Sequence, residues 1–175
     1  QTVREAEVYP NRGNIYDRDG NPLAINIETS SLFALPKNIL NLKDTVRELN
    51  RAVQDLKFWE LYSKLKHQTK YTWIARKIPL KQKQVELVKK INGIYIEAVP
   101  KRVYPNKELL SQIIGFVGID NKGLSGLEYT FDSFLRGKPR IIKYLKDAKG
   151  RAIKFESEEK DEGNHDIHLT INIDL

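Results

Sequence analysis

A helical spacing of apolar residues begins at Leu42 and is the most regular pattern along the chain. Steps of four, three, four and three residues place side chains on one face of a helix. The apolar positions at this spacing are Leu42, Val46, Leu49, Val53 and Leu56. A second helical pattern consists of Phe58, Trp59, Leu61, Tyr62 and Leu65. The two patterns predict a pair of amphipathic helices in the first half of the chain.

Three further helices are predicted from end signals and spacing. Residues 80–91 should form a helix that ends at Asn92–Gly93, since asparagine and glycine favour helix C-termini. Asn106 is predicted to cap a short helix that continues to residue 114. A last helix should cover residues 127–137 and stop at Gly137. Its apolar face would consist of Leu127, Phe131, Phe134 and Leu135.

Strands are predicted where apolar residues alternate with polar ones and proline or glycine bounds the run. The predicted strands are residues 23–35, 71–78, 94–99 and 165–175, with Pro36 and Pro100 as breaks. Residues 140–156 should form a hairpin around a turn at 147–150. The acidic residues 156–163 are expected to be an exposed connector.

The order of these elements predicts an α+β fold, because strands and helices do not alternate regularly. The largely helical residues 37–99 lie between two strand-forming, glycine-rich segments. We therefore expect a discontinuous mixed β scaffold, the anchor (residues 1–36 and 100–162), with an inserted and largely helical head lobe (residues 37–99).

Composition is typical of a soluble globular domain, with 175 residues, 40% hydrophobic and 30% charged. No stretch approaches the roughly 20 apolar residues that cross a bilayer. We expect a fragment that lacks an upstream signal or anchor, since the chain begins at Gln1. The absence of cysteine excludes disulfides and thiolate metal sites, and it is compatible with the periplasm.

The formal net charge of +7 is unevenly distributed. Residues 156–166 have a net charge of −5, so the remainder has +12. Such a basic body could approach nucleic acid, anionic lipid headgroups or an acidic partner. The Lys and Arg residues recur along helical faces without interleaved aromatic residues, which favours a solvated basic surface and no nucleic-acid binding.

The segment RGNIYDRDGNPLA (residues 12–24) combines acids, amides, arginines and glycines. Its oxygen side chains match calcium-loop positions 1, 3, 5 and 12, and they are Asp17, Asp19, Asn21 and Glu28. The match fails at position 6, where Pro22 replaces the required glycine and Gly20 lies two places early. A β-turn is favoured instead, with Arg12 and Arg18 available to pair with carboxylates.

Candidate catalytic groups are sparse. The pair Ser63 and Lys66 fits the S-x-x-K spacing of serine transpeptidases, but it lies in an amphipathic helix and no S-x-N or K-T-G follows. A solvated helix face is the favoured interpretation. His67, His165 and His168 are scattered and are expected at the surface. The sequence therefore predicts no catalytic residue, no cofactor and no metal in this chain.

Five ordered segments resemble the class B penicillin-binding proteins. Residues 12–24 resemble the R-G-x-I-x-D-R-x-G-x-x-L-A signature that follows the membrane helix of that family. The other segments are WIARKI, KRVYPNKELLSQIIGFVG, GLSGLEYTFDSFLRG and DIHLTINIDL. The last resembles the strand that opens the transpeptidase domain. The resemblance extends over nearly the whole chain.

This resemblance implies a non-catalytic pedestal, also called the dimerisation domain, over residues 1–162. Residues 163–175 would be the first strand of a truncated transpeptidase domain. The parent protein would be a D,D-transpeptidase on the periplasmic face of the bacterial cytoplasmic membrane, attached through an upstream helix. The pedestal would contact its own transpeptidase domain, and two copies could form a homodimer.

In residues 115–128 the G-F-x-G motif is followed closely by G-L-E, without the long insertion usual in elongation-type members. This short connection favours the division branch of the family. The resemblance then implies a SEDS-type glycosyltransferase and other divisome membrane proteins as partners. An elongation-type protein is the alternative, with a rod-shape glycosyltransferase and a coiled-coil scaffold protein as its partners.

A structural network is expected among the residues that match the family motifs. These residues are Arg12, Gly13, Asp17, Arg18, Gly20, Arg102, Gly115, Gly126 and Glu128. Within this set, we expect Arg12, Arg18 and Arg102 to form ion pairs with Glu128. The hypothesis is that Glu128→Ala would uncouple the lobes, because a broken buried pair leaves an uncompensated charge.

Overall fold

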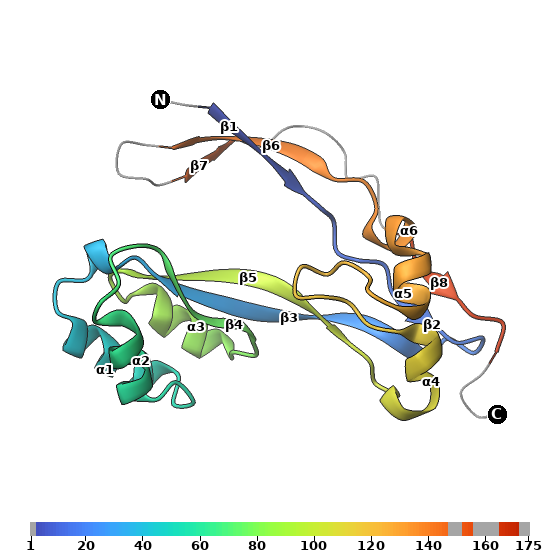
Figure 1. Cartoon of the computed structure of the whole chain (residues 1–175), viewed down its shortest axis with the longest axis horizontal. Coiled ribbons are helices and arrows are strands. Elements are labelled where there is room, and N and C mark those ends of the chain that lie inside the picture. Colours follow the sequence, from blue (N-terminus) through green and yellow to red (C-terminus); the bar gives the residue numbers. More distant parts are fainter. Residues whose placement is uncertain (1–2, 147–151, 156–164, 172–175) are drawn as a thin grey trace. The chain divides into compact units, whose positions relative to one another are not determined.

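The computed structural model describes residues 3–146, 152–155 and 165–171, and it has the α+β composition that the sequence predicts (Figure 1). The strands are β1 (Val3–Val8), β2 (Ile15–Tyr16), β3 (Pro22–Ala34), β4 (Thr72–Ile78), β5 (Ile94–Val103), β6 (Arg140–Lys146), β7 (Ala152–Phe155) and β8 (Ile167–His168). The helices are the 3-10 turn η1 (Pro36–Asn38), α1 (Leu42–Ala52), α2 (Phe58–Leu65), α3 (Gln82–Lys89), α4 (Lys107–Ile114), α5 (Gly126–Thr130) and α6 (Asp132–Arg136). Among the helices in the described ranges, none is long and apolar enough to cross a membrane.

The chain divides into two compact units. Unit 1 comprises Gln1–Ile27 and Arg102–Leu175, and unit 2 comprises Glu28–Lys101. The borders fall inside β3 and β5, so two long strands belong partly to each unit.

Unit 2 is built on β3, which pairs with both β4 and β5. Alternate residues of these strands and the apolar faces of α1, α2 and α3 form one core. Its fully buried members include Leu32, Val46, Leu49 and Val88. Asn41 caps α1 by accepting a hydrogen bond from the Asp44 N–H at 3.1 Å. The helix predicted to begin at Leu42 is therefore confirmed, but it ends at Ala52, so Val53 and Leu56 of the predicted face lie beyond it.

Unit 1 contains two small β structures. One is the antiparallel sheet β1-β6-β7. In the other, β2 pairs antiparallel with the start of β3 and parallel with β8. The core beside β2 comprises Ile15, Leu23, Ala24, Ile114 and Leu135. This core brings together residues from four separate parts of the chain, and it positions α4, α5 and α6 beside the segment that begins at Arg12.

Three predicted element boundaries are wrong. Within the described residues 165–171, the strand predicted over 165–175 is limited to Ile167–His168. The strand predicted to stop at Pro100 continues to Val103. Proline is tolerated there because β5 pairs with β3 alone among the described strands, which leaves one edge without ladder partners. The single helix predicted over residues 127–137 is two short helices with a break at Phe131 (φ −105°, ψ 23°). Phe131 and Phe134 are 43% and 46% exposed rather than buried.

Other expectations are met in part or lie outside the described residues. The hairpin is present as the antiparallel pair β6 and β7. Its turn at 147–150, the acidic connector 156–163 and the end of the last predicted strand lie outside the described ranges. Asn106 occupies the cap position of α4, but its side chain makes no capping hydrogen bond; its Nδ2 donates instead to the Pro22 carbonyl at 3.4 Å. The strand β1 was not predicted.

Candidate functional site

A buried carboxylate at Glu128, on α5, lies between two buried arginines of unit 1. Glu128 is 0% exposed, Arg12 is 3% exposed and Arg102 is 6% exposed. Arg12 Nε donates to Glu128 Oε2 at 2.7 Å, and Arg12 Nη2 lies 2.6 Å from the same oxygen. Arg102 Nε donates to the other oxygen, Oε1, at 2.7 Å. Each carboxylate oxygen therefore has its own guanidinium partner.

The remaining donors of Arg12 bind to the same part of the fold. Nη2 also donates to the Glu128 carbonyl at 2.7 Å, and Nη1 donates to Asp132 Oδ1 at 2.6 Å and to the Asn121 carbonyl at 3.1 Å. Asp132 Oδ1 also accepts the Gly123 N–H at 2.8 Å. Arg12 is thus bonded to α5, to the start of α6 and to the loop that precedes them.

Arg102 connects the end of β5 to the same site. Its Nη1 donates to Asn26 Oδ1 at 3.3 Å, and Asn26 Nδ2 donates to the Arg12 carbonyl. Its Nη2 is buried without a hydrogen-bond partner among the described residues. The two arginines and the carboxylates of Glu128 and Asp132 balance in formal charge, which offsets much of the cost of burying them.

Tyr104 adds a neutral donor to this network. Its hydroxyl donates to Glu128 Oε1 at 3.3 Å. Burial and the neighbouring Glu128 carboxylate raise the pKa of Tyr104 above its ordinary value of 10.0, although Arg102 lowers it. The hydroxyl therefore remains protonated at neutral pH and can donate to the carboxylate.

The turn that follows Arg12 is organised by Asp17, which is fully buried. Asp17 Oδ1 accepts the N–H groups of Asp19 and Asn21 at 2.9 and 2.7 Å, and Oδ2 accepts Asn21 Nδ2 at 2.9 Å. Gly20 completes the turn at φ +84° and donates its N–H to the Asp17 carbonyl. This geometry is the predicted β-turn. Among the described residues, no group of three or more acids or histidines is placed to hold a metal ion.

Arg18 is not part of the Glu128 network. The turn directs it to an exposed position, and it forms no ion pair with the described residues. Its backbone N–H donates to the Ile171 carbonyl at 2.9 Å. The expectation of three arginines at Glu128 is therefore wrong for Arg18, because the turn built by Asp17 separates it from Arg12.

Three of the predicted glycines lie at close approaches between backbone segments. A Cβ on Gly115 would lie 1.9 Å from the Ser125 carbonyl oxygen, and one on Gly126 would lie 2.5 Å from the Ile113 carbonyl oxygen. Gly13 donates its N–H to the Leu135 carbonyl at 2.7 Å. The end of α4 and the start of α5 can therefore meet only without side chains.

Several residues of the network were not predicted. They are Asn26, Tyr104, Asn121, Gly123 and Asp132. A signal existed for Asp132, which follows Glu128 by four residues, a spacing that places two side chains on one side of a helical segment. A Cβ on Gly123 would lie 1.9 Å from the Glu128 carbonyl oxygen. No local pattern shows that requirement.

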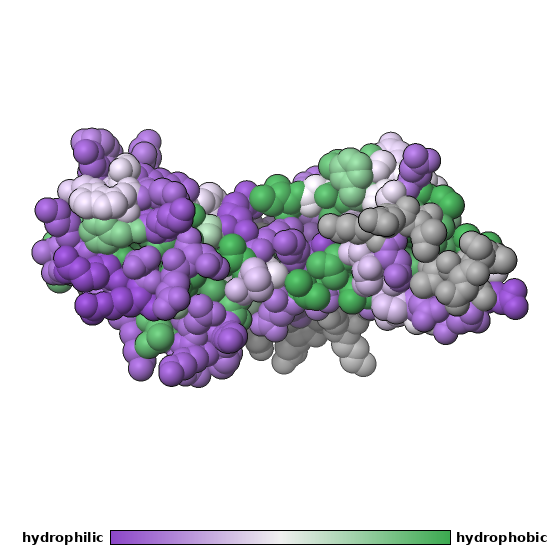
Figure 2. Space-filling view, turned by 90° about the horizontal axis from the view of Figure 1, so that it is seen from below, coloured by the Kyte–Doolittle hydropathy of each residue, from purple (hydrophilic) through white to green (hydrophobic). Residues whose placement is uncertain are grey.

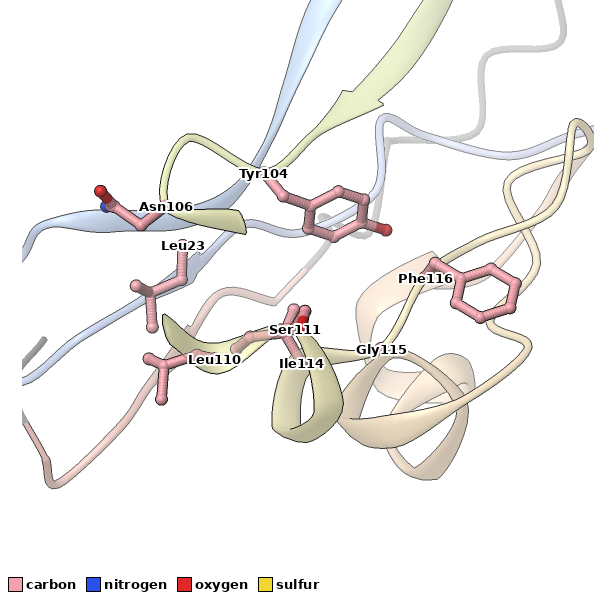
Figure 3. A pocket seen from close by; sticks show the side chains of 8 residues that line it. All are labelled: Leu23, Tyr104, Asn106, Leu110, Ser111, Ile114, Gly115 and Phe116. Carbon is pink, nitrogen blue, oxygen red and sulfur yellow. The ribbon is translucent and has the colours of Figure 1, made fainter. Parts of the chain in front are cut away.

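An apolar pocket of about 220 Å³ adjoins the network (Figure 3). Its walls come from the start of β3, the residues after β5, and α4 with the residues that follow it. They are Leu23, Tyr104, Asn106, Leu110, Ser111, Ile114, Gly115 and Phe116. Tyr104 therefore belongs both to the pocket wall and to the network. The sequence did not predict this pocket.

The other candidate groups lie at exposed positions. Ser63 and Lys66 are exposed at α2, and His67 is exposed beside them. His165 stacks on Phe134 with ring centroids 4.6 Å apart, and His168 stacks on Tyr16 at 5.0 Å. Ser63 and Lys66 thus lie on a solvated helix face, as favoured from the sequence.

Comparison with known proteins gives a family-model match described as the penicillin-binding protein dimerisation domain, over residues 7–169. The stage V sporulation protein D of Bacillus subtilis is 31% identical over 171 residues, which cover 94% of this chain and 26% of that protein. The peptidoglycan D,D-transpeptidase FtsI of Escherichia coli (strain K12) is 28% identical over 183 residues, which cover 98% of this chain and 30% of that protein. The chain spans less than a third of the length of these relatives.

Solved structures share the fold. A complex between penicillin-binding protein PBP2 and MreC from Helicobacter pylori matches with a TM-score of 0.66 and 20% identity, over 99% of this chain and 37% of that one. A peptidoglycan synthetase from Bifidobacterium adolescentis matches with a TM-score of 0.66 and 23% identity, over 99% of this chain and 38% of that one. At these identities the likeness concerns the fold alone.

Replacing Glu128 by glutamine should strongly destabilise the protein. The side chain keeps its shape but loses the charge that compensates Arg12 and Arg102, so we expect a loss of about 3 to 5 kcal/mol in the free energy of unfolding. Urea unfolding followed by circular dichroism measures this loss. The control is Asp120→Asn, an exposed acid of the same unit, for which we expect a change of less than about 0.5 kcal/mol. Equal effects of the two substitutions would contradict a stabilising network.

Alanine substitutions at two glycines should distinguish two causes of lost stability, a strained backbone conformation and a steric collision. At Gly20 nothing lies within 4 Å of the added Cβ, but φ is +84°, so alanine should cost about 1 to 2 kcal/mol. At Gly123 the Cβ would collide with the Glu128 carbonyl, and we expect a larger loss of stability and a change in near-ultraviolet circular dichroism. A Gly123→Ala protein as stable as the wild type would show that this contact is absent in solution.

Proposed function

Because the chain belongs to the penicillin-binding protein dimerisation domain family, we propose that it is the non-catalytic pedestal of a septal peptidoglycan D,D-transpeptidase. In this proposal residues 1–162 are the pedestal, with an anchor of residues 1–36 and 100–162 and a head lobe of residues 37–99. Residues 163–175 begin the transpeptidase domain. The pedestal positions that catalytic domain on the extracytoplasmic side of the membrane, with attachment through an upstream helix.

The single observation that supports a positioning role is the buried network around Glu128. Its three charged centres, Arg12, Arg102 and Glu128, come from three segments that resemble family motifs, and all three are less than 10% exposed. Every interaction of the Glu128 carboxylate described above is with the protein's own groups. Such a site holds segments in a fixed geometry and has no open position for a substrate.

The division branch is supported by the short connection between Gly115 and Glu128. Within it, the Gly118 N–H donates to the Lys122 carbonyl at 2.9 Å, and Val117 forms an isolated bridge with Gly123. The chain passes from one motif to the next through a tight loop without an insertion. The partners in this branch would be a SEDS-type glycosyltransferase, other divisome membrane proteins and, for a homodimer, a second copy.

The elongation branch is the second candidate, as the alternative that the sequence left open. The fold matches the PBP2 of Helicobacter pylori, which was solved in complex with MreC. Depletion of the parent protein in its host separates the two branches. We expect long cells without septa, because a division enzyme would be missing. Round cells that still divide would instead assign the protein to elongation.

A labelled penicillin tests the proposal that this chain has no catalytic serine. The parent protein should form a covalent adduct, and the 175-residue chain alone should not. Ser63→Ala in the parent should leave labelling unchanged, because Ser63 and Lys66 lie on a solvated helix face. In-gel fluorescence measures the adduct. Labelling of the isolated chain that disappears with Ser63→Ala would overturn the proposal of a non-catalytic pedestal.

A further inference from the structure

Unit 2 has a larger net positive charge than the whole chain. Residues 28–101 contain 15 Lys and Arg against 7 Asp and Glu, a formal net charge of +8. The whole chain has a net charge of +7, so unit 1 has −1. The charged groups of unit 1 are thus balanced overall, whereas those of unit 2 are not.

The helix α3 has a dense group of lysines without acidic partners. Lys81 and Lys90 are at the two cap positions, and Lys83 and Lys89 lie within the helix. None of these four lysines forms an ion pair with any residue in the described ranges. All four are exposed. The same segment holds one exposed acid, Glu86, which accepts a hydrogen bond from Gln82 Nε2 at 3.4 Å. Residues 81–90 therefore keep a formal net charge of +3, which is available to an external anion.

Helical spacing aligns two of these lysines with an exposed leucine. Val88 of α3 is fully buried in the core of unit 2. On the exposed side, Lys83, Leu87 and Lys90 follow one another at steps of four and three residues, and Leu87 is 43% exposed. The helix therefore presents a stripe in which an apolar side chain lies between two cations.

We propose that this surface of unit 2, the α3 lysine face (Lys81, Lys83, Leu87, Lys89 and Lys90), binds the surface of a membrane that contains anionic phospholipids. Four or more basic residues on an amphipathic helix are typical of binding to anionic lipid headgroups. Leu87 can enter the boundary between headgroups and acyl chains, and the lysines can extend to the phosphates. This proposal goes beyond the pedestal function and does not rest on it.

The residue types favour a lipid surface over an acidic protein. Lysine is depleted in protein–protein interfaces, where arginine and aromatic residues are enriched, and the charged face of α3 has no arginine. Arginine would also be preferred for bidentate recognition of single phosphates. The side of unit 2 that is seen from below in Figure 2 is mostly hydrophilic, with isolated hydrophobic side chains. This pattern fits a peripheral contact dominated by charge.

Sedimentation of the 175-residue chain with lipid vesicles tests the proposal. We expect binding to vesicles with about one third phosphatidylglycerol at low salt, weaker binding as salt rises, and none to pure phosphatidylcholine vesicles. The double substitution Lys83→Gln and Lys90→Gln should lower the partition coefficient by about fivefold for each lysine removed. Leu87→Gln should lower it further.

The matched control is Lys122→Gln with Lys143→Gln in unit 1, which removes the same total charge and should leave binding nearly unchanged. Circular dichroism checks that each variant is folded. Any one of three results would overturn the proposal. The first is no binding to anionic vesicles, and the second is an equal loss of binding in the two double variants. The third is binding to soluble polyglutamate that is as strong as binding to vesicles and that Leu87→Gln does not affect. The last result would assign the face to an acidic protein.

Discussion

The structure of unit 1 depends on the burial of one carboxylate. Glu128 is fully inaccessible to solvent, and an isolated charge in such a place would be very unfavourable. It is tolerated because Arg12 and Arg102 each donate to a different oxygen at 2.7 Å. These arginines are 116 and 26 residues away along the chain. The electrostatic requirement of a single side chain therefore fixes the positions of three distant segments.

The glycines near the network follow from the same requirement. For Arg12 to reach the Glu128 carbonyl, Asp132 and Asn121 together, the loop before α5 must lie against the backbone of that helix. Gly123 allows this approach, because a side chain there would overlap with the Glu128 carbonyl group. Gly126 allows the end of α4 to lie against the start of α5 in the same way. The break between α5 and α6 lies one residue before Asp132, where the carboxylate is held by Arg12 and by the Gly123 N–H.

Local pattern was sufficient to predict α1, α2 and the turn at Asp17. Their determinants are close in sequence, such as the apolar spacing that begins at Leu42 and the hydrogen bonds that Asn21 donates to Asp17. The failures have non-local causes. Pro100 stays in a strand because β5 has an open edge. The helix break at Phe131 lies directly before Asp132, whose carboxylate accepts a hydrogen bond from Arg12, 120 residues away. Arg18 looked equivalent to Arg12 in the motif, yet the Asp17 turn separates them. The strand β1 exists only through its pairing with β6.

The charged residues of the two units differ in their burial and pairing. In unit 1, Arg12, Arg102 and Glu128 are buried and their charges largely neutralise one another. In unit 2, the core is apolar and the lysines of α3 remain at the surface without an ion-pair partner in the described ranges. Charged residues that are not needed for folding remain available for recognition. The α3 lysines belong to unit 2 and form no ion pair in the described ranges, whereas the Glu128 network lies in unit 1. Changes to these lysines should therefore leave the network intact, and the two properties can be altered separately.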